Sequence, residues 1–298
     1  MRKNFYKYLT SIFKNDSRIV ILLGDIGVFS LKSAFDHDSS RAYNLGIMEQ
    51  SMIGAACGLS KSGLIPFVHS IAPFITERSY EQLKLNLGYE NVNSFIVSVG
   101  NSYDYAGLGC THHCPNDLKI VSSIPNFKTY CPGNSNDVQE IINKNLETQC
   151  PKYIRLSEEE NNLTSLQANY EDLAELHYNQ NGICIIIGNA IKDIVSLVNS
   201  NPKYTIVYTY NISDFDIKKL NSIIERGGIS KKITVVEPCS DSGIISKIAT
   251  SIKNIESINS ISVPKMFIEK YGKKENIDKY LELDDNSIVE KLSKIYEH

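Results

Sequence analysis

Short apolar runs alternate with stretches of helical periodicity along the first half of the chain. The runs with strand character cover residues 18–23, 65–68, 94–99, 127–130 and 152–156. Helical patterns cover residues 48–61, 75–86 and 135–146. This alternation of strand and helix predicts a parallel sheet with helices on both of its faces.

The second half of the chain repeats this organisation. Strands are predicted at residues 183–189, 204–210 and 233–236, and helices at residues 190–199, 216–226 and 243–252. Between the halves, residues 157–182 are polar and lack sustained periodicity, which is typical of a linker. We therefore predict an α/β protein with two doubly wound, mostly parallel sheets, with domains at residues 1–160 and 181–298 and a linker at 161–180.

The composition is that of a globular protein without a nucleic-acid or membrane partner. Of 298 residues, 42% are apolar and 22% are charged, and the net charge of −3 provides no basic field for nucleic acid. No apolar run approaches the length of a bilayer span. The seven cysteines are odd in number and scattered, as in proteins that keep reduced thiols, so we expect a cytoplasmic protein.

One carboxylate stands where a strand end gives way to a helix of small residues. Glu49 lies within residues 44–52 (NLGIMEQSM), and residues 53–59 (IGAACGL) follow directly. Because the surrounding sequence is apolar and a charged side chain is rarely buried without a reason, Glu49 is a candidate functional residue. Taken alone, the segment favours the simpler interpretation, an acid at a helix N-terminus that is stabilised by the helix dipole.

A second dense segment follows the strand predicted at residues 94–99. Residues 106–118 read AGLGCTHHCPNDL, and ligand sites of parallel sheets lie beyond the carboxyl ends of strands. Cys110, His112 and Cys114 are competent zinc ligands, but structural zinc sites usually draw on a second ligand pair, so we expect no metal ligands on this chain. A capped loop before a helix is the structural alternative, although it does not explain the glycines and the threonine.

In order and spacing, these motifs resemble the transketolase family of thiamine diphosphate enzymes, in the part that holds the pyrimidine-binding and C-terminal domains. The motifs are residues 46–49 (GIME), 66–74 (PFVHSIAPF), 109–113 (GCTHH), 124–126 (IPN) and 235–238 (VVEP). The resemblance extends over nearly the whole chain. It implies the same two-domain fold and a bound thiamine diphosphate.

The resemblance implies a set of cofactor residues. Glu49 would lie against the ring nitrogen of the aminopyrimidine, where a shared proton favours the imino form of the cofactor that acts as base. Phe74 would stack on the ring, although a core phenylalanine is the alternative for this residue. Asp25 and Ile26 occupy the strand-end turn that reaches the cofactor in the family, and Ile71 replaces a second aromatic residue.

The resemblance also implies substrate residues, and several positions depart from it. His112, and with it His113, would hydrogen-bond the hydroxyl groups of a ketose, and Arg2 would correspond to a phosphate ligand. Where common transketolases have a histidine and an arginine for the sugar phosphate, this chain has Gly100 and Glu158. Because an acid repels a phosphate, we predict a sugar that is unphosphorylated, deoxygenated or linked to a nucleotide. The aspartate that recognises a sugar hydroxyl in the family is replaced by Leu108, which supports the same prediction.

A domain that binds Mg²⁺ and the diphosphate through a Gly-Asp-Gly turn is not found in this sequence. The resemblance therefore implies a split enzyme that transfers a two-carbon ketol unit between sugars, with a second subunit supplying that domain in an α2β2 heterotetramer. Two alternatives remain. The chain could be the beta subunit of a 2-oxo acid dehydrogenase first component, or a scaffold homologue without catalytic activity.

Overall fold

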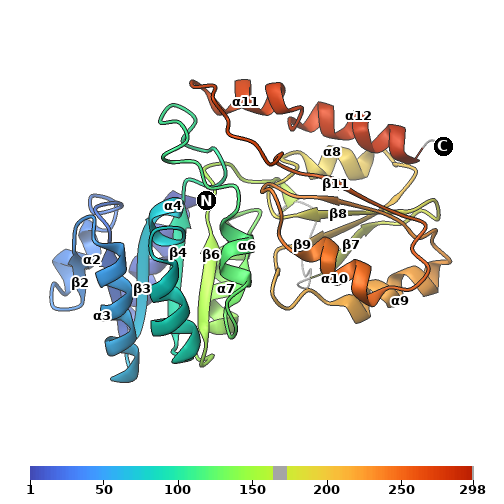
Figure 1. Ribbon diagram of the computed structural model, residues 1–298. Coiled ribbons are helices and arrows are strands. Elements are labelled where there is room, and N and C mark those ends of the chain that lie inside the picture. The colour runs from blue at the N-terminus through green and yellow to red at the C-terminus, as the bar shows by residue number, and fades with distance from the viewer. Residues whose placement is uncertain (164–172, 297–298) are drawn as a thin grey trace.

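The computed structural model describes residues 1–163 and 173–296, which form two α/β domains side by side (Figure 1). The first domain contains a six-stranded sheet in the order β2-β1-β3-β4-β6-β5, and all of its pairs are parallel. Its strands are β1 (Ile19–Leu23), β2 (Ala42–Asn44), β3 (Ile65–Ile71), β4 (Ser94–Val99), β5 (Lys128–Tyr130) and β6 (Pro151–Arg155). The predicted α/β class with a parallel sheet is confirmed.

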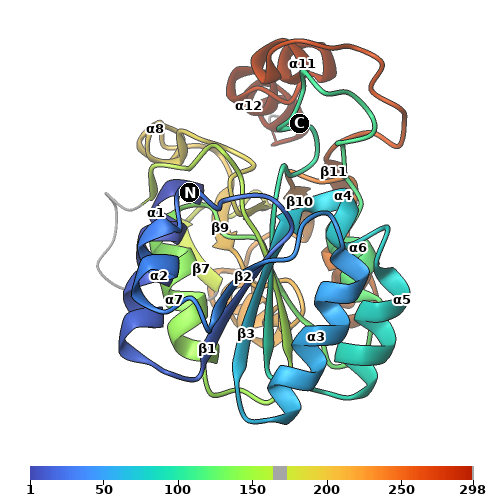
Figure 2. The same cartoon turned by 90° about the vertical axis from the view of Figure 1, so that its left-hand side faces the viewer.

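Helices cover both faces of this first sheet (Figure 2). One face is covered by α1 (Arg2–Asn15), α2 (Lys32–His37) and α7 (Ser135–Asn145). The other face is covered by α3 (Glu49–Lys61), the π-helix η1 (Leu83–Tyr89) and α6 (Asp117–Ser122). Successive residues of β1 point to opposite faces, since Ile19, Ile21 and Leu23 join one core cluster while Val20 and Leu22 join the other.

The single helix predicted at residues 75–86 is wrong. The chain forms three short pieces here, α4 (Ala72–Ile75), α5 (Tyr80–Gln82) and η1. At the break, two side-chain hydroxyls donate hydrogen bonds to backbone carbonyls. Thr76 Oγ1 donates to Ala72 O at 2.7 Å, and Ser79 Oγ donates to Phe74 O at 3.1 Å. Phe74 lies in α4, the short helix that directly follows β3, and therefore at the carboxyl end of the sheet.

The second domain contains a five-stranded sheet in the order β11-β10-β8-β9-β7. Its strands are β7 (Leu173–His177), β8 (Ile183–Ile187), β9 (Thr205–Thr209), β10 (Lys232–Val236) and β11 (Ser257–Ile261). Its helices are α8 (Ile194–Asn199), α9 (Ile217–Gly227), α10 (Ile244–Ser251), α11 (Lys274–Leu281) and α12 (Asp285–Tyr296). In Figure 1, α8, α11 and α12 lie above this sheet and α9 and α10 lie below it.

The segment predicted as a linker contributes a strand to the second sheet. Residues 164–172 lie outside the described residues, but β7 begins at Leu173 and pairs antiparallel with β9. Only its first residues, Leu173 and Ala174, are buried, and its register shifts between Glu175 and His177. A short edge strand with a bulge has little regular alternation, so the sequence pattern does not reveal it.

The two domains meet at a buried ion pair. Arg155, at the end of β6, donates through Nε to Asp117 at 2.8 and 3.0 Å, and neither side chain is exposed. Its Nη2 donates to Ser102 Oγ at 2.7 Å and to the carbonyl of Pro238, in the second domain, at 3.4 Å. Within the described part of the chain, no helix is long and apolar enough to cross a membrane.

Candidate active site

Glu49, the first residue of α3, lies at the carboxyl end of the first sheet with a side chain that is 1% exposed. Its Oε1 accepts a hydrogen bond of 2.7 Å from Ser70 Oγ on β3. Gly24, which follows β1, packs against both groups, because a Cβ there would lie 2.8 Å from Ser70 Oγ and 3.4 Å from Glu49 Oε1. A buried carboxylate needs such partners to remain charged, and the close approach of Gly24 excludes water from it.

The second carboxylate oxygen of Glu49 is held by Arg78. Arg78 Nη1 lies 3.1 Å from Glu49 Oε2, and the centre of its guanidinium lies 4.2 Å from the centroid of the Phe74 ring. The guanidinium therefore stacks on Phe74 while it donates to Glu49. A flat cation thus occupies the space between the acid and the aromatic ring.

His112 extends this cluster from the loop that follows β4. Its ring packs edge-on against Phe74 with the centroids 5.2 Å apart, and it also lies 6.3 Å from the ring of Tyr105. The hydroxyl of Thr111 lies 2.9 Å from Nδ1 of His112. The structure therefore brings Glu49, Phe74 and His112, three residues singled out in the sequence, to one end of the sheet.

Arg2 approaches the same cluster from the start of α1. Its Nη1 donates to the hydroxyl of Tyr105 at 3.0 Å, and it lies 4.0 Å from Glu158 Oε1. Glu158 therefore balances the positive charge of Arg2. Because Tyr105 also contacts His112, Arg2 is connected to the cluster through one aromatic side chain.

The other predicted residues lie around the cluster. Asp25 is exposed and adopts a φ of 57°, and it exchanges two hydrogen bonds with the side chain of Asn44 at 3.0 and 3.1 Å. Ile26 and Ile71 are partly buried and pack on the core. His113, by contrast, is buried, and burial lowers the pKa of its imidazole. His112 is thus the histidine of this pair whose side chain is open to solvent.

A buried histidine outside the predicted site residues supports the strand ends. His69 on β3 is flanked by a carbonyl and a hydroxyl, with Val97 O 2.8 Å from Nδ1 and the Tyr6 hydroxyl 2.9 Å from Nε2. Since a carbonyl can only accept, Nδ1 carries the proton and Nε2 accepts from Tyr6. Burial, together with the charge of Arg2, lowers the pKa of His69 to about 4. In the sequence, the sign of this role is a histidine within the otherwise apolar strand of residues 65–71.

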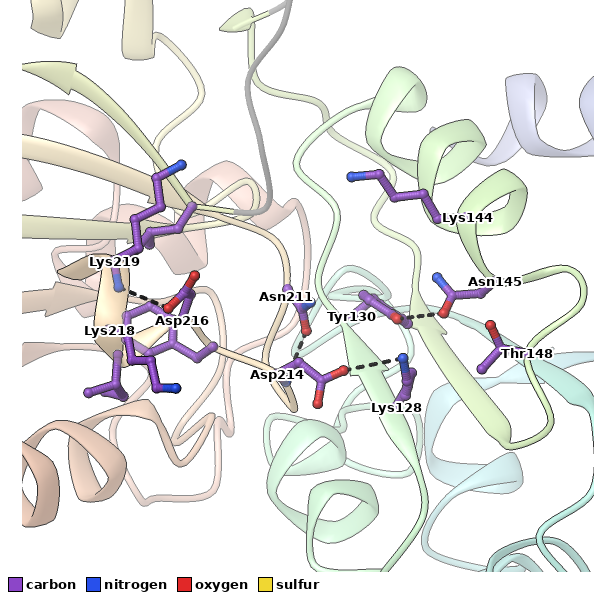
Figure 3. A pocket seen from close by; sticks show the side chains of 13 residues that line it. Lys128, Tyr130, Lys144, Asn145, Thr148, Asn211, Asp214, Asp216, Lys218 and Lys219 are labelled. Atoms are coloured by element: carbon purple, nitrogen blue, oxygen red, sulfur yellow. Dashed lines mark hydrogen bonds and ion pairs between the residues drawn. The ribbon is translucent and has the colours of Figure 1, made fainter. Parts of the chain in front are cut away.

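A large cavity lies away from the Glu49 cluster. It measures about 980 Å³ and opens between β5, α7 and the segment that leads into α9 (Figure 3). Lys128 and Asp214 pair across it at 3.4 Å, and Asp216 caps α9 from its wall. None of the predicted site residues lines this cavity. In the order of the sheet, β4 and β6 lie between β5, which lines this cavity, and β3, which carries Ser70 of the Glu49 cluster.

No group of three or more histidine, cysteine, aspartate or glutamate side chains that could hold a metal ion occurs within residues 1–163 and 173–296. Cys110, His112 and Cys114, the zinc candidates of the loop, therefore do not form such a group. Cys110 is exposed, whereas Cys114 is buried with its Sγ 3.5 Å from Thr76 Oγ1.

Exposed apolar side chains are frequent in the segment that leads from β1 to Glu49. They come from the loop after β1, from the edge strand β2 and from the start of α3, and they are Val28, Phe29, Tyr43, Leu45, Ile47 and Met48. Phe29 is 90% exposed and Ile47 is 67% exposed. A group of exposed apolar residues of this kind is typical of a surface that another chain covers.

Comparison with known proteins gives a consistent set of relatives. Residues 1–164 match the family described as the transketolase pyrimidine-binding domain. The chain is 30% identical over 230 residues to an uncharacterized 33.6 kDa protein in the fasciation locus of Rhodococcoides fascians, covering 77% of this chain and 73% of that protein. It is 32% identical over 120 residues to one subunit of the apulose-4-phosphate transketolase of Actinobacillus succinogenes, covering 40% and 39% of the two chains. It is 31% identical over 157 residues to the 6-deoxy-6-sulfo-D-fructose transketolase subunit SqwH of a Clostridium species, covering 52% and 49%.

Solved structures share the fold at lower identity. A split-gene transketolase described as an inactive β4 tetramer has a TM-score of 0.82 and 21% identity, with 99% of this chain and 97% of that chain covered. The transketolase of Campylobacter jejuni has a TM-score of 0.78 and 15% identity, with 98% of this chain covered. The chain spans 46% of the length of the Campylobacter protein. Both structures share the two-domain fold of this chain.

Proposed function

This chain belongs to the transketolase family through its pyrimidine-binding domain, and from that premise we propose that it is the pyrimidine-binding subunit of a split, thiamine diphosphate-dependent transketolase. The enzyme would transfer a two-carbon ketol unit between sugars. Its relatives include proteins named as transketolase subunits for apulose 4-phosphate and for a sulfonated fructose. The free state of all seven cysteines is compatible with the cytoplasmic location that we propose.

The observation that carries this proposal is the position of the Arg78 guanidinium. It is planar, it donates to the carboxylate of Glu49 at 3.1 Å, and it stacks on Phe74 at 4.2 Å. A protonated aminopyrimidine is also planar, with an in-plane N–H donor and an aromatic face, so the guanidinium stands in for it. The residues present therefore fit the cofactor ring. Arg78 is 43% exposed and can turn into solvent when the ring enters.

Bound thiamine diphosphate would supply the electron sink needed to break a carbon–carbon bond beside a ketone. Glu49 would hold a proton at the pyrimidine nitrogen, and Ser70 and Gly24 would keep its carboxyl group oriented and dry. Phe74 would fix the plane of the ring. His112, which is partly exposed beside Phe74, would donate a hydrogen bond to an oxygen of the sugar.

A partner subunit would complete the site. Within the described residues, no three or more histidine, cysteine, aspartate or glutamate side chains form a metal-binding group, and we assign Mg²⁺ and the diphosphate to the partner. The exposed apolar residues of the segment that leads from β1 to Glu49, Phe29 and Ile47 among them, form the surface that this partner would cover. We propose an α2β2 heterotetramer, and we expect the isolated chain to be inactive, like the split-gene β4 tetramer that shares its fold.

The substrate would be an uncommon sugar. Glu158 stands where common transketolases have a phosphate-binding arginine, and it lies 4.0 Å from Arg2, the remaining cation of the predicted phosphate site. Leu108, which is 54% exposed on the loop, replaces a hydroxyl-binding acid. These residues favour a sugar that is unphosphorylated, deoxygenated or nucleotide-linked over a pentose phosphate.

Purification of the native complex tests this proposal. We expect the chain to co-purify with a subunit that carries a Gly-Asp-Gly turn, and the reconstituted pair to transfer ketol units in the presence of thiamine diphosphate and Mg²⁺. Decarboxylation of pyruvate-like acids in place of ketol transfer would identify a 2-oxo acid dehydrogenase beta subunit. Absence of thiamine diphosphate binding with the partner present would identify a scaffold protein.

A further inference from the structure

The loop that carries His112 is supported by the second domain. Residues 106–113 leave the first sheet after β4 and rise beside the segment between β11 and α11, as both views show (Figures 1 and 2). Several residues of the loop are exposed, including Leu108, Cys110 and Thr111. A glycine-rich, exposed loop has many accessible conformations, so a defined position for His112 requires contacts from outside the loop.

The tip of the loop lies against Tyr271. Gly109 has a φ of +74°, and a Cβ built on it would clash with the ring of Tyr271. The ring therefore packs directly on the backbone of Gly109. The carbonyl of Gly109 in turn accepts a hydrogen bond of 3.0 Å from the backbone N–H of His112. Tyr271, from the second domain, thus contacts Gly109, the residue that closes the turn before His112.

The base of the loop is held from the same side. The backbone N–H of Gly272 donates to the carbonyl of Ala106 at 3.3 Å, and the hydroxyl of Tyr103 donates to Asp278 on α11 at 2.9 Å. A small apolar cluster joins the two domains here. It consists of Tyr103, Ala106, Val263, Ile268 and Ile277, all of which are buried.

From these contacts we infer that Tyr271 is a positioning residue for His112, and that the segment of residues 262–273 sets the orientation of this histidine toward the sugar. The inference rests on the proposed function of His112. It gives the second domain, which contributes none of the predicted cofactor or substrate residues, a direct part in the reaction. The atoms of Tyr271 nearest to the Cβ position of Gly109 are Cε1, Cζ and the hydroxyl oxygen, and the contact is one of packing, so we expect the ring to be sufficient for it.

Three variants of the full chain, assembled with its partner, test this inference. Tyr271→Ala is expected to lower kcat/KM for the donor sugar about ten- to hundredfold, because loop misplacement weakens an oriented hydrogen bond, while the affinity for thiamine diphosphate stays unchanged. Tyr271→Phe keeps the ring and is expected to restore near-normal kinetics. Phe267→Ala is the matched control, since Phe267 lies in the same segment and is 82% exposed.

Hydrogen–deuterium exchange provides a readout that needs no turnover. Tyr271→Ala is expected to speed exchange in peptides that cover residues 106–113 and to leave α3 unchanged. If this variant fails to fold, Gly109→Ala perturbs the same contact from the loop side and is expected to give the same exchange pattern. Unchanged exchange at residues 106–113, or failure of Tyr271→Phe to restore the kinetics, would overturn the inference. Faster exchange in an assembly whose wild type transfers no ketol unit would count against the proposed function and not against the positioning contact.

Discussion

Arg78 and Glu49 form an ion pair in which the carboxylate is 1% exposed and the guanidinium side chain is 43% exposed. The two partners therefore differ in their freedom to move. Glu49 is fixed by Ser70 and by the packing of Gly24, whereas Arg78 can exchange the carboxylate for water. An incoming ring that offers an N–H donor and a flat face can replace Arg78 without moving Glu49.

Removal of Arg78 should therefore not weaken cofactor binding. We expect Arg78→Ala to bind thiamine diphosphate at least as tightly as wild type in the assembled enzyme, because an internal competitor is lost. The isolated chain should lose about 1 kcal/mol of stability, as for a partly exposed ion pair. Calorimetric titration measures the first effect and urea unfolding the second. A tenfold loss of cofactor affinity would show that Arg78 binds the cofactor itself.

Replacing Glu49 should abolish turnover without disturbing assembly. Glu49→Gln keeps the shape and the Ser70 contact but cannot share a proton with the pyrimidine, so we expect at least a hundredfold loss of kcat. Size-exclusion chromatography should show the same complex as wild type. Glu81→Gln, which neutralises an exposed acid on α5, is the matched control and should retain full activity.

The main strands were predictable because their composition leaves few alternatives. The apolar runs of β1, β4 and β8 are buried along their whole length, and the small residues after Glu49 form α3 as expected. Other elements carry weaker signals. β11 (Ser257–Ile261) is mostly polar because it lies at a sheet edge, and α1 is missing from the predicted elements although its buried residues recur at helical spacing.

The site could be predicted only in part. Glu49, Phe74 and His112 are identified through family motifs, and the structure brings them together. The role of Arg78 depends on the break after α4, which turns its side chain back toward α3. The contact of Tyr271 with Gly109 joins residues from different domains, so no local pattern could reveal it.

The buried pair between Asp117 and Arg155 should dominate stability at the domain junction. Asp117→Asn leaves a fully buried guanidinium without its counter-charge, so we expect a loss of about 3 kcal/mol or more. The double variant Asp117→Asn with Arg155→Met removes both charges and should recover most of this loss. Urea unfolding of the two variants checks the prediction, and equal stability of the two would contradict it.

Two buried groups act in opposite directions at acid pH. Burial lowers the pKa of His69 from 6.5 to about 4, so the unfolded chain alone binds this proton in that range and stability falls on acidification. Burial raises the pKa of Asp104 from 3.8 to about 6, so the folded chain alone binds that proton and stability rises on acidification. The two effects oppose each other between pH 6 and 4.

Asp104→Asn should expose the effect of His69. As the pH is lowered from 6 to 4, the free energy of unfolding of this variant should fall, relative to wild type, by about 1.4 kcal/mol for each pH unit. The amide oxygen can still accept from the Ser157 hydroxyl and the backbone N–H of Glu158, which bond Asp104 at 3.0 and 3.2 Å. Urea unfolding at a series of pH values measures the slope. Parallel curves for wild type and variant would contradict the assignment.

Glu158 should determine whether the enzyme accepts a phosphorylated sugar. It lies 4.0 Å from Arg2, and Arg2 donates to Tyr105, which contacts His112. In Glu158→Arg the repulsive acid is lost and a second guanidinium joins Arg2, so a phosphate could be bound by both. We expect kcat/KM for phosphorylated ketoses to rise about tenfold relative to unphosphorylated ones, with a stronger dependence on salt.

The control for this variant reverses a distant charge. Glu225→Arg changes the net charge equally from an exposed position on α9, so it separates local from overall electrostatics. It should leave the ratio between the two sugar classes unchanged, because a charge separated by more than a Debye length is screened. If Glu158→Arg raised both sugar classes equally, or if Glu225→Arg gave the same preference, Glu158 would not lie at the phosphate end of the substrate, and Arg2 would have to be assigned a structural role.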